Sequence, residues 1–266
     1  MSIHEEIKDQ QKKLKDKDFK TRWNYFWDYY KIHVIIALIA IIAIVSTVRS
    51  IVNTKPNAIY AVLLNSGYDA SREDLEKGFI EYAGVDTSEY SCLIDVSSTF
   101  DQTSVDQMTL ATSQKIMANV AAKEIDALGG DTATFAYYAS QDVFTDLTTV
   151  FSAQELEAFG DDIFYIDGAY MDYIASDEYQ EQVLNGKFDQ NNKYAVIAQK
   201  AMREGKFDII PKEEMERPIP IGVILKSSTT LKDAGAYQGD MTPVIGIIGN
   251  TTRIDNAKAL VEYLHK

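Results

Sequence analysis

The stretch Ile59–Leu64, IYAVLL, is a short, continuous apolar run that ends at the polar sequence Asn65-Ser66-Gly67. An apolar run without alternation is typical of a strand buried on both faces, as in a parallel sheet. The sequence SRED at Ser71–Asp74 then predicts a capped helix, and Tyr90–Val96 predicts a second strand. This βαβ rhythm predicts an α/β fold built on a parallel sheet.

The succession of predicted strands and helices continues toward the C-terminus. Further strands are predicted at Ile125–Leu128, Ile163–Ile166, Ile219–Leu225 and Val244–Ile248, with Gly129, Gly130 and Asp131 following the first of them as a loop. Helix starts are predicted at the capping boxes Ser104–Gln107 and Ser152–Glu155 and at Asp255, and helix ends at Gly186 and Gly205.

The segment upstream of this region has a different character. Ile32–Val48, IHVIIALIAIIAIVSTV, is almost wholly apolar and is bracketed by Lys31 and Arg49. At about 1.5 Å per residue it covers roughly 25 Å, and its extension to Val52 approaches the ~30 Å of a bilayer core. The run is longer than the ~7–15 apolar residues in the hydrophobic region of a cleaved signal peptide. We therefore expect an uncleaved transmembrane signal anchor at residues 32–52.

Charge predicts the side on which each part lies. The basic residues before the span are Lys8, Lys12, Lys13, Lys15, Lys17, Lys20, Arg22 and Lys31, whereas Arg49 and Lys55 alone follow it closely. The positive-inside rule then keeps residues 1–31, a basic and aromatic leader, in the cytoplasm. A linker at 53–57 leads to an extracytoplasmic domain at 58–266, so we expect a single-pass plasma-membrane protein.

Composition excludes several classes of function for the predicted domain. The net charge is −14, and because the leader is slightly basic, the acidic excess belongs to the domain, which argues against nucleic acid as a partner. Cys92 is the only cysteine, so thiolate metal sites and intrachain disulfides are excluded; it is expected to be buried and inert. The three histidines are His4, His33 and His265, which leaves none in the domain interior for histidine catalysis.

Two stretches resemble a known family. Lys115–Asp131, KIMANVAAKEIDALGGD, and Phe135–Leu147, FAYYASQDVFTDL, resemble a helix, strand and loop of bacterial extracellular solute-binding proteins with the type 2 periplasmic-binding fold; Ile245–Leu264 resembles their closing βα unit. The resemblance implies two lobes, one at about 58–145 and 218–266 and the other at about 146–217, with solute bound between them.

The resemblance also implies a set of ligand-binding residues at the ends of strands. They are Asn65, Ser66, Gly67, Ser97, Ser98, Thr99, Gly130 and Asp131. Each supplies hydrogen-bonding groups, but a purely structural interpretation stays open, since Gly67 and Gly130 suit turns and Ser71 and Ser104 suit helix caps.

Three functions remain at this point. The leading hypothesis is a membrane-tethered, solute-binding-like module that binds a small solute or peptide and passes the bound state to a membrane partner. The alternative is a cell-envelope interaction or scaffold protein with the same fold and no small-molecule ligand. A hydrolase based on Asp161 and Asp162 is disfavoured because adjacent side chains diverge, so we expect no enzymatic activity and no cofactor or metal.

Overall fold

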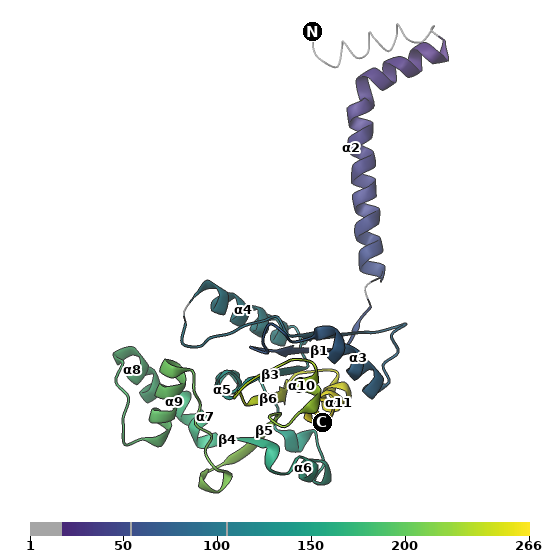
Figure 1. Ribbon diagram of the computed structural model, residues 1–266. Coiled ribbons are helices and arrows are strands. Elements are labelled where there is room, and N and C mark those ends of the chain that lie inside the picture. Colours follow the sequence, from purple (N-terminus) through teal and green to yellow (C-terminus); the bar gives the residue numbers. More distant parts are fainter. Residues whose placement is uncertain (1–17, 54, 105) are drawn as a thin grey trace. The chain divides into compact units, whose positions relative to one another are not determined.

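The computed structural model describes residues 18–53, 55–104 and 106–266 (Figure 1). Residues 1–17 of the predicted leader, Thr54 of the predicted linker and Val105 of a predicted capping box lie outside the described residues. The chain divides into two units, Met1–Lys55 and Pro56–Lys266. The first unit contains the 35-residue helix α2 (Phe19–Asn53). Within it, Tyr30–Arg49 has a mean hydropathy of 2.5 and is long and apolar enough to cross a membrane.

The second unit is a mixed α/β fold with one six-stranded sheet in the order β2-β1-β3-β6-β5-β4. The strands are β1 (Asn57–Leu63), β2 (Ser91–Asp95), β3 (Ala127–Asp131), β4 (Ile163–Asp167), β5 (Pro218–Ile224) and β6 (Pro243–Ile247). β1 pairs in parallel with β2 and β3, which confirms the predicted βαβ rhythm. β6 pairs antiparallel with β3 and β5, and β5 pairs antiparallel with β4, so the prediction of a parallel sheet is wrong for this half.

Helices connect and cover the strands. They are α3 (Arg72–Ala83), α4 (Gln107–Ala121), α5 (Thr132–Ala139), α6 (Ala153–Phe159), α7 (Gly168–Ile174), α8 (Asp177–Asn185), α9 (Lys193–Glu204), α10 (Thr229–Asp233) and α11 (Ile254–His265). Short 3₁₀ turns lie at Leu147–Thr149, Gly160–Asp162 and Lys212–Glu214. Figure 1 shows α7, α8 and α9 gathered beside β4 at one end of the sheet.

Both faces of β1 are buried, as its unbroken apolar run predicts. Ile59, Ala61 and Leu63 face a core shared with α3 and α11. Tyr60 and Val62 face a second core that includes Ile116 of α4 and Tyr138 of α5. Alternate side chains of a strand point to opposite faces, so this part of the sheet is the middle layer of a three-layer α/β arrangement.

The antiparallel half has a core of its own, to which α5, β4, α7 and α9 contribute. It adjoins the other half at the stacked rings of Phe135 and Phe144, whose centroids are 4.2 Å apart. A Cβ atom on Gly222 or Gly246 would lie within 3 Å of the Phe135 ring. Because only glycine permits this close approach, the two positions let α5 sit directly on β5 and β6.

Several predicted helix ends are confirmed and two predicted caps are wrong. Ser152 and Glu155 form a complete capping box, and Gly186 and Gly205 end their helices in the left-handed conformation. Ser104 does not cap α4, because the side chain of Asp106 accepts from the backbone N–H of Thr109 at 2.7 Å. Asp255 lies in the first turn of α11 and is not its cap.

The sheet is continuous across the predicted lobe boundaries. β4 belongs to the predicted second lobe and β5 to the first, yet β4 pairs with β5 along its whole length. Residues Pro56–Lys266 form one unit by their contacts. The two-lobed division therefore stays a prediction.

Candidate functional site

Asn65 joins the ends of β1 and β3. It follows β1 with a φ of 59°, a left-handed conformation that asparagine tolerates better than most residues. Its side-chain amide donates to the carbonyl of Phe100 at 2.8 Å and to the carboxylate of Asp131 at 3.0 Å, while its oxygen accepts from the Phe100 N–H at 2.9 Å. Since Phe100 holds both ends of the amide, the orientation of Asn65 is fixed.

Asp131 ends β3 and caps α5. One carboxylate oxygen accepts from the N–H groups of Ala133 and Thr134, and the other accepts from the Thr134 hydroxyl and from Asn65. These four donors use the ordinary capacity of a carboxylate. The group therefore acts as a fixed negative charge that holds Asn65 in place at the strand ends.

A second polar network follows β2. Asp95, the last residue of that strand, accepts from Ser97 and from the Ser98 hydroxyl and pairs with Lys115 of α4 at 2.9 Å. Burial alone would raise the pKa of Asp95, but the hydrogen bonds from Lys115 and the two serines hold it well below its usual range. This network fixes the course of the chain after β2.

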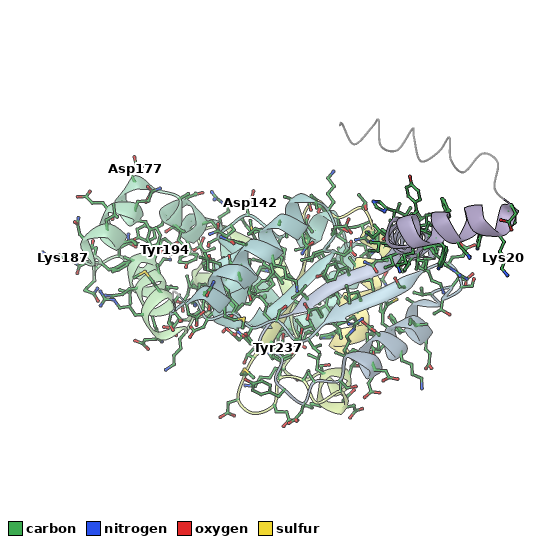
Figure 2. The ribbon with its side chains drawn as sticks, turned by 90° about the horizontal axis from the view of Figure 1, so that it is seen from above. Lys20, Asp142, Asp177, Lys187, Tyr194 and Tyr237 are labelled. Carbon is green, nitrogen blue, oxygen red and sulfur yellow. The ribbon has the colours of Figure 1, made fainter. Side chains whose placement is uncertain are left out.

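Tyr237, which Figure 2 labels, forms hydrogen bonds to the turn after β1. The Tyr237 hydroxyl donates to the carbonyl of Leu64 at 2.8 Å, and its N–H donates to the carbonyl of Ser66 at 2.7 Å. The Ser66 hydroxyl in turn donates to the Val96 carbonyl. The turn is thus held by buried hydrogen bonds from both sides.

The strand ends line a cavity of about 920 Å³. We call it the strand-end cavity; it is bordered by Asn65, Phe100, Asp101, Gln102, Thr103, Asp131, Thr132, Ala133, Thr134, Glu204, Gly205, Lys206, Phe207, Asp208, Asp240, Met241 and Thr242. One wall consists of residues at and after the ends of β1, β2 and β3, and the other of residues at the end of α9 and in the loop before β6. This is the kind of hollow, at the carboxyl ends of parallel strands, in which α/β proteins bind ligands.

The predicted site residues separate into three groups. Asn65 and Asp131 border the strand-end cavity. Asn65, Ser66, Gly67, Ser97 and Thr99 border a neighbouring cavity of about 380 Å³. Ser98 and Gly130 line neither of the two: Ser98 bonds to Asp95, and Gly130 lies inside β3 against Thr134. The prediction that Gly130 belongs to a loop after the strand is therefore wrong, since β3 begins and ends later than expected.

Sequence reasoning missed the far wall of the strand-end cavity. Glu204–Asp208 comes from the end of α9, and Asp240–Thr242 from the loop before β6. The Gly205 helix stop was the only local signal in the first segment. Within the part of the chain that the structure describes, the buried side-chain nitrogen of Gln102, which also borders the cavity, has no hydrogen-bond partner.

Charge in the strand-end cavity is predominantly negative. Five carboxylates border it, from Asp101, Asp131, Glu204, Asp208 and Asp240, against one lysine, Lys206. Lys206 lies 4.0 Å from Glu204, and Asp208 pairs with Lys200 of α9 at 2.6 Å. The remaining excess of carboxylates opposes the entry of an anion.

Other reactive groups lie outside the cavity. Cys92 is buried as predicted, and burial, with the nearby Glu76, raises the pKa of its thiol to about 11. Asp162, considered above as a hydrolase carboxylate, contacts the His265 ring at 2.9 Å. Over residues 18–53, 55–104 and 106–266, no group of three or more His, Cys, Asp or Glu side chains is arranged to hold a metal ion.

No protein-family model matches the chain, and comparison with curated proteins and with solved structures gives no significant match.

Proposed function

We propose that the chain is a membrane-tethered, extracytoplasmic binding module. It captures a small solute or peptide in the strand-end cavity and passes the bound state to a membrane partner. The apolar helix segment Tyr30–Arg49 supports the tether. The excess of basic residues before that segment supports an outward-facing domain. The motifs that resemble solute-binding proteins support the binding role.

The observation that carries the proposal is the composition of the cavity walls. Asn65 and Asp131 stand on strand ends of the parallel half, while Glu204–Asp208 follows a helix of the other half. A solute between these walls would contact both halves of the domain. Its binding would therefore favour one arrangement of the two walls, and a partner can recognise that arrangement.

The chain offers a selective probe of domain unfolding. Cys92 is its only cysteine and is buried in β2, so a maleimide reacts with it fully only when the domain opens. We would heat the full-length protein in detergent with the maleimide present and test polyamines, amino acids, sugars and short peptides. The negative cavity makes cationic and neutral solutes the first probes.

A bound solute that is present at a free concentration of about 100 times its dissociation constant adds about 2.7 kcal/mol to the free energy of unfolding. Labelling of Cys92 should then shift to a higher temperature in proportion to the logarithm of solute concentration. The absence of a shift with every solute class would reject the binding module and favour the envelope interaction protein.

The outward orientation has a separate test. Protease added to intact cells should digest residues 56–266 and leave the leader protected. Protection of the domain in intact cells, with digestion in inverted vesicles, would reject the proposed topology.

A further inference from the structure

The first turns of α2 carry an exposed aromatic stripe. Phe19, Trp23 and Trp27 stack in succession, with ring centroids 6.3 and 6.4 Å apart, and Phe26 stacks on Tyr30 at 5.2 Å. Trp23 and Trp27 are 54% and 46% exposed. The spacing i, i+4, i+7, i+8 and i+11 places these five rings on one face of the helix. Phe19, Trp23, Phe26 and Trp27 are all exposed, and an exposed row of large apolar rings favours an apolar environment.

The neighbouring face of the same turns is polar. Lys20, Asn24 and Lys31 recur at i, i+4 and i+11, and the centre of this group lies about 100° around the helix from the centre of the aromatic stripe. An apolar face beside a polar face with lysines is typical of a helix that lies in the plane of a membrane interface. A helix crossing the hydrocarbon would need apolar residues all round.

The helix is also bent. Figure 1 shows the start of α2 turning away from the long straight rod that follows it. In Figure 2 the rod is seen nearly end-on, and the part that includes Lys20 runs sideways from it. The 20 residues Tyr30–Arg49 suffice to cross a bilayer core of ~30 Å at about 1.5 Å per residue. The turns before Tyr30 are therefore not needed for the span.

Charge indicates which surface these turns would meet. The stretch from Lys8 to Arg22 contains seven basic residues and three acidic ones, a net charge of +4. Each lysine or arginine near a surface of anionic lipid contributes favourably to binding. The acidic domain at 56–266 has the opposite character.

We propose that the first three turns of α2, Phe19–Tyr30, lie along the bilayer surface and bind anionic lipid headgroups. The aromatic stripe enters the interface and the basic residues meet the headgroup phosphates, while Tyr30–Arg49 crosses the membrane. This inference rests on the proposed membrane span and is independent of solute binding.

Both tryptophans of the chain, Trp23 and Trp27, lie in these turns, so tryptophan fluorescence of the full-length protein reports on this segment alone. We would reconstitute the protein, with Trp23→Phe and Trp27→Phe variants, into phosphatidylcholine vesicles with or without phosphatidylglycerol. Lipids brominated at graded depths would quench each tryptophan. An in-plane helix places both rings at the same shallow depth. A helix that continues straight out of the span places Trp23 about 6 Å further from the bilayer centre than Trp27.

We expect equal, shallow depths and stronger quenching when phosphatidylglycerol is present. The double variant Lys20→Gln with Arg22→Gln should lose that extra quenching. The control Lys187→Gln with Lys232→Gln, which removes two charges from exposed positions of the domain outside the strand-end cavity, should retain it. Unequal depths, or quenching that is the same in both lipids, would overturn the proposal. Because the readout does not involve Cys92 or a solute, its failure is distinguishable from failure of the binding module.

Discussion

Two aspartates in this fold have the same local role and different surroundings. Asp131 ends β3 and caps α5, and Asp167 ends β4 and caps α7. Each carboxylate accepts four hydrogen bonds. For Asp167 these come from the Ala169 N–H, the Tyr194 hydroxyl and the N–H groups of Glu216 and Arg217. For Asp131 they come from its own helix and from Asn65.

The difference lies in what covers each group. Asp167 is 2% exposed, enclosed by α9 and by the chain that leads into β5. Asp131 is partly exposed and borders the strand-end cavity. At these two places, one in each half, the aspartate that ends a strand also starts the next helix, whereas Asp95 at the end of β2 does not. Whether the carboxylate is buried or borders a cavity depends on segments that are distant in the sequence, such as α9 and the chain before β5.

The largest effect on stability is expected for Asp167→Asn. The amide retains one acceptor, but its NH₂ group would face the donors of Tyr194, Glu216 or Arg217 in a buried position. We expect a loss of roughly 2–4 kcal/mol in the free energy of unfolding, measured by denaturant titration. The control Asp172→Asn removes an equal charge from an exposed ion pair with Arg217 and should cost at most about 1 kcal/mol. Equal losses of unfolding free energy in the two variants would show that the buried hydrogen bonds of Asp167 do not stabilise the fold as proposed.

The pH dependence of the free energy of unfolding should also report on Asp167. Burial by itself would raise the pKa of Asp167, but hydrogen bonds from Glu216, Tyr194, Ala169 and Arg217 lower it. A carboxyl whose pKa is lower in the folded state stabilises the fold above its unfolded pKa of about 3.9 and loses that contribution as pH falls through the folded value. The interval from about pH 5 to about pH 3 brackets the pKa of an unfolded aspartate. Over it, the free energy of unfolding should therefore fall more steeply in the wild type than in Asp167→Asn. Parallel pH profiles would contradict this.

Asp131→Asn should cost less than Asp167→Asn. Asparagine is as good a helix cap as aspartate, so the bonds from Ala133 and Thr134 survive. The new NH₂ group opposes the amide of Asn65, which Phe100 prevents from turning. One lost hydrogen bond corresponds to about 1 kcal/mol, measurable by the same titration. A loss as large as that of Asp167→Asn would show that the two aspartates are equally structural.

The smallest effects concern an exposed cap. Asp106→Ala should lower the free energy of unfolding more than Ser104→Ala does, because it removes the hydrogen bond to the Thr109 N–H at the start of α4. Ser104→Ala should change stability by less than about 0.5 kcal/mol, as expected for a surface residue that does not cap. Thermal unfolding followed by circular dichroism measures both, and the reverse ranking would restore Ser104 as the cap.

Local signals were enough for the strands, and the family resemblance pointed to residues of one wall of the cavity. The apolar runs at Ile59–Leu64 and Val244–Ile248 predicted strands that the structure confirms as β1 and β6. Asn65 and Asp131 were predicted from the resemblance to solute-binding proteins, and they lie together because polar residues at the ends of buried parallel strands meet at one edge of the sheet. Ser104 was chosen over Asp106 because two good capping residues stand two positions apart and the box pattern fits the wrong one.

Other features depend on tertiary structure. A short apolar run carries no direction, so the antiparallel pairing of β6 with β3 and β5 could not be predicted from Val244–Ile248. Glu204–Asp208 reaches the cavity from a part of the chain about 70 residues beyond Asp131. The strand boundary that placed Gly130 in a loop was off by two to three residues, since Gly129 and Gly130 pair with β6 as regular strand residues.

The most direct test of the account is a titration of the wild type, Asp131→Asn and Asp172→Asn with the solute that most delays Cys92 labelling on heating. Asp131→Asn should bind about tenfold more weakly, because it loses a cavity charge and sets an NH₂ group against the amide of Asn65. Asp172→Asn, which loses the same charge elsewhere, should bind as the wild type does. Wild-type affinity in Asp131→Asn would contradict the assignment of the strand-end cavity as the binding site.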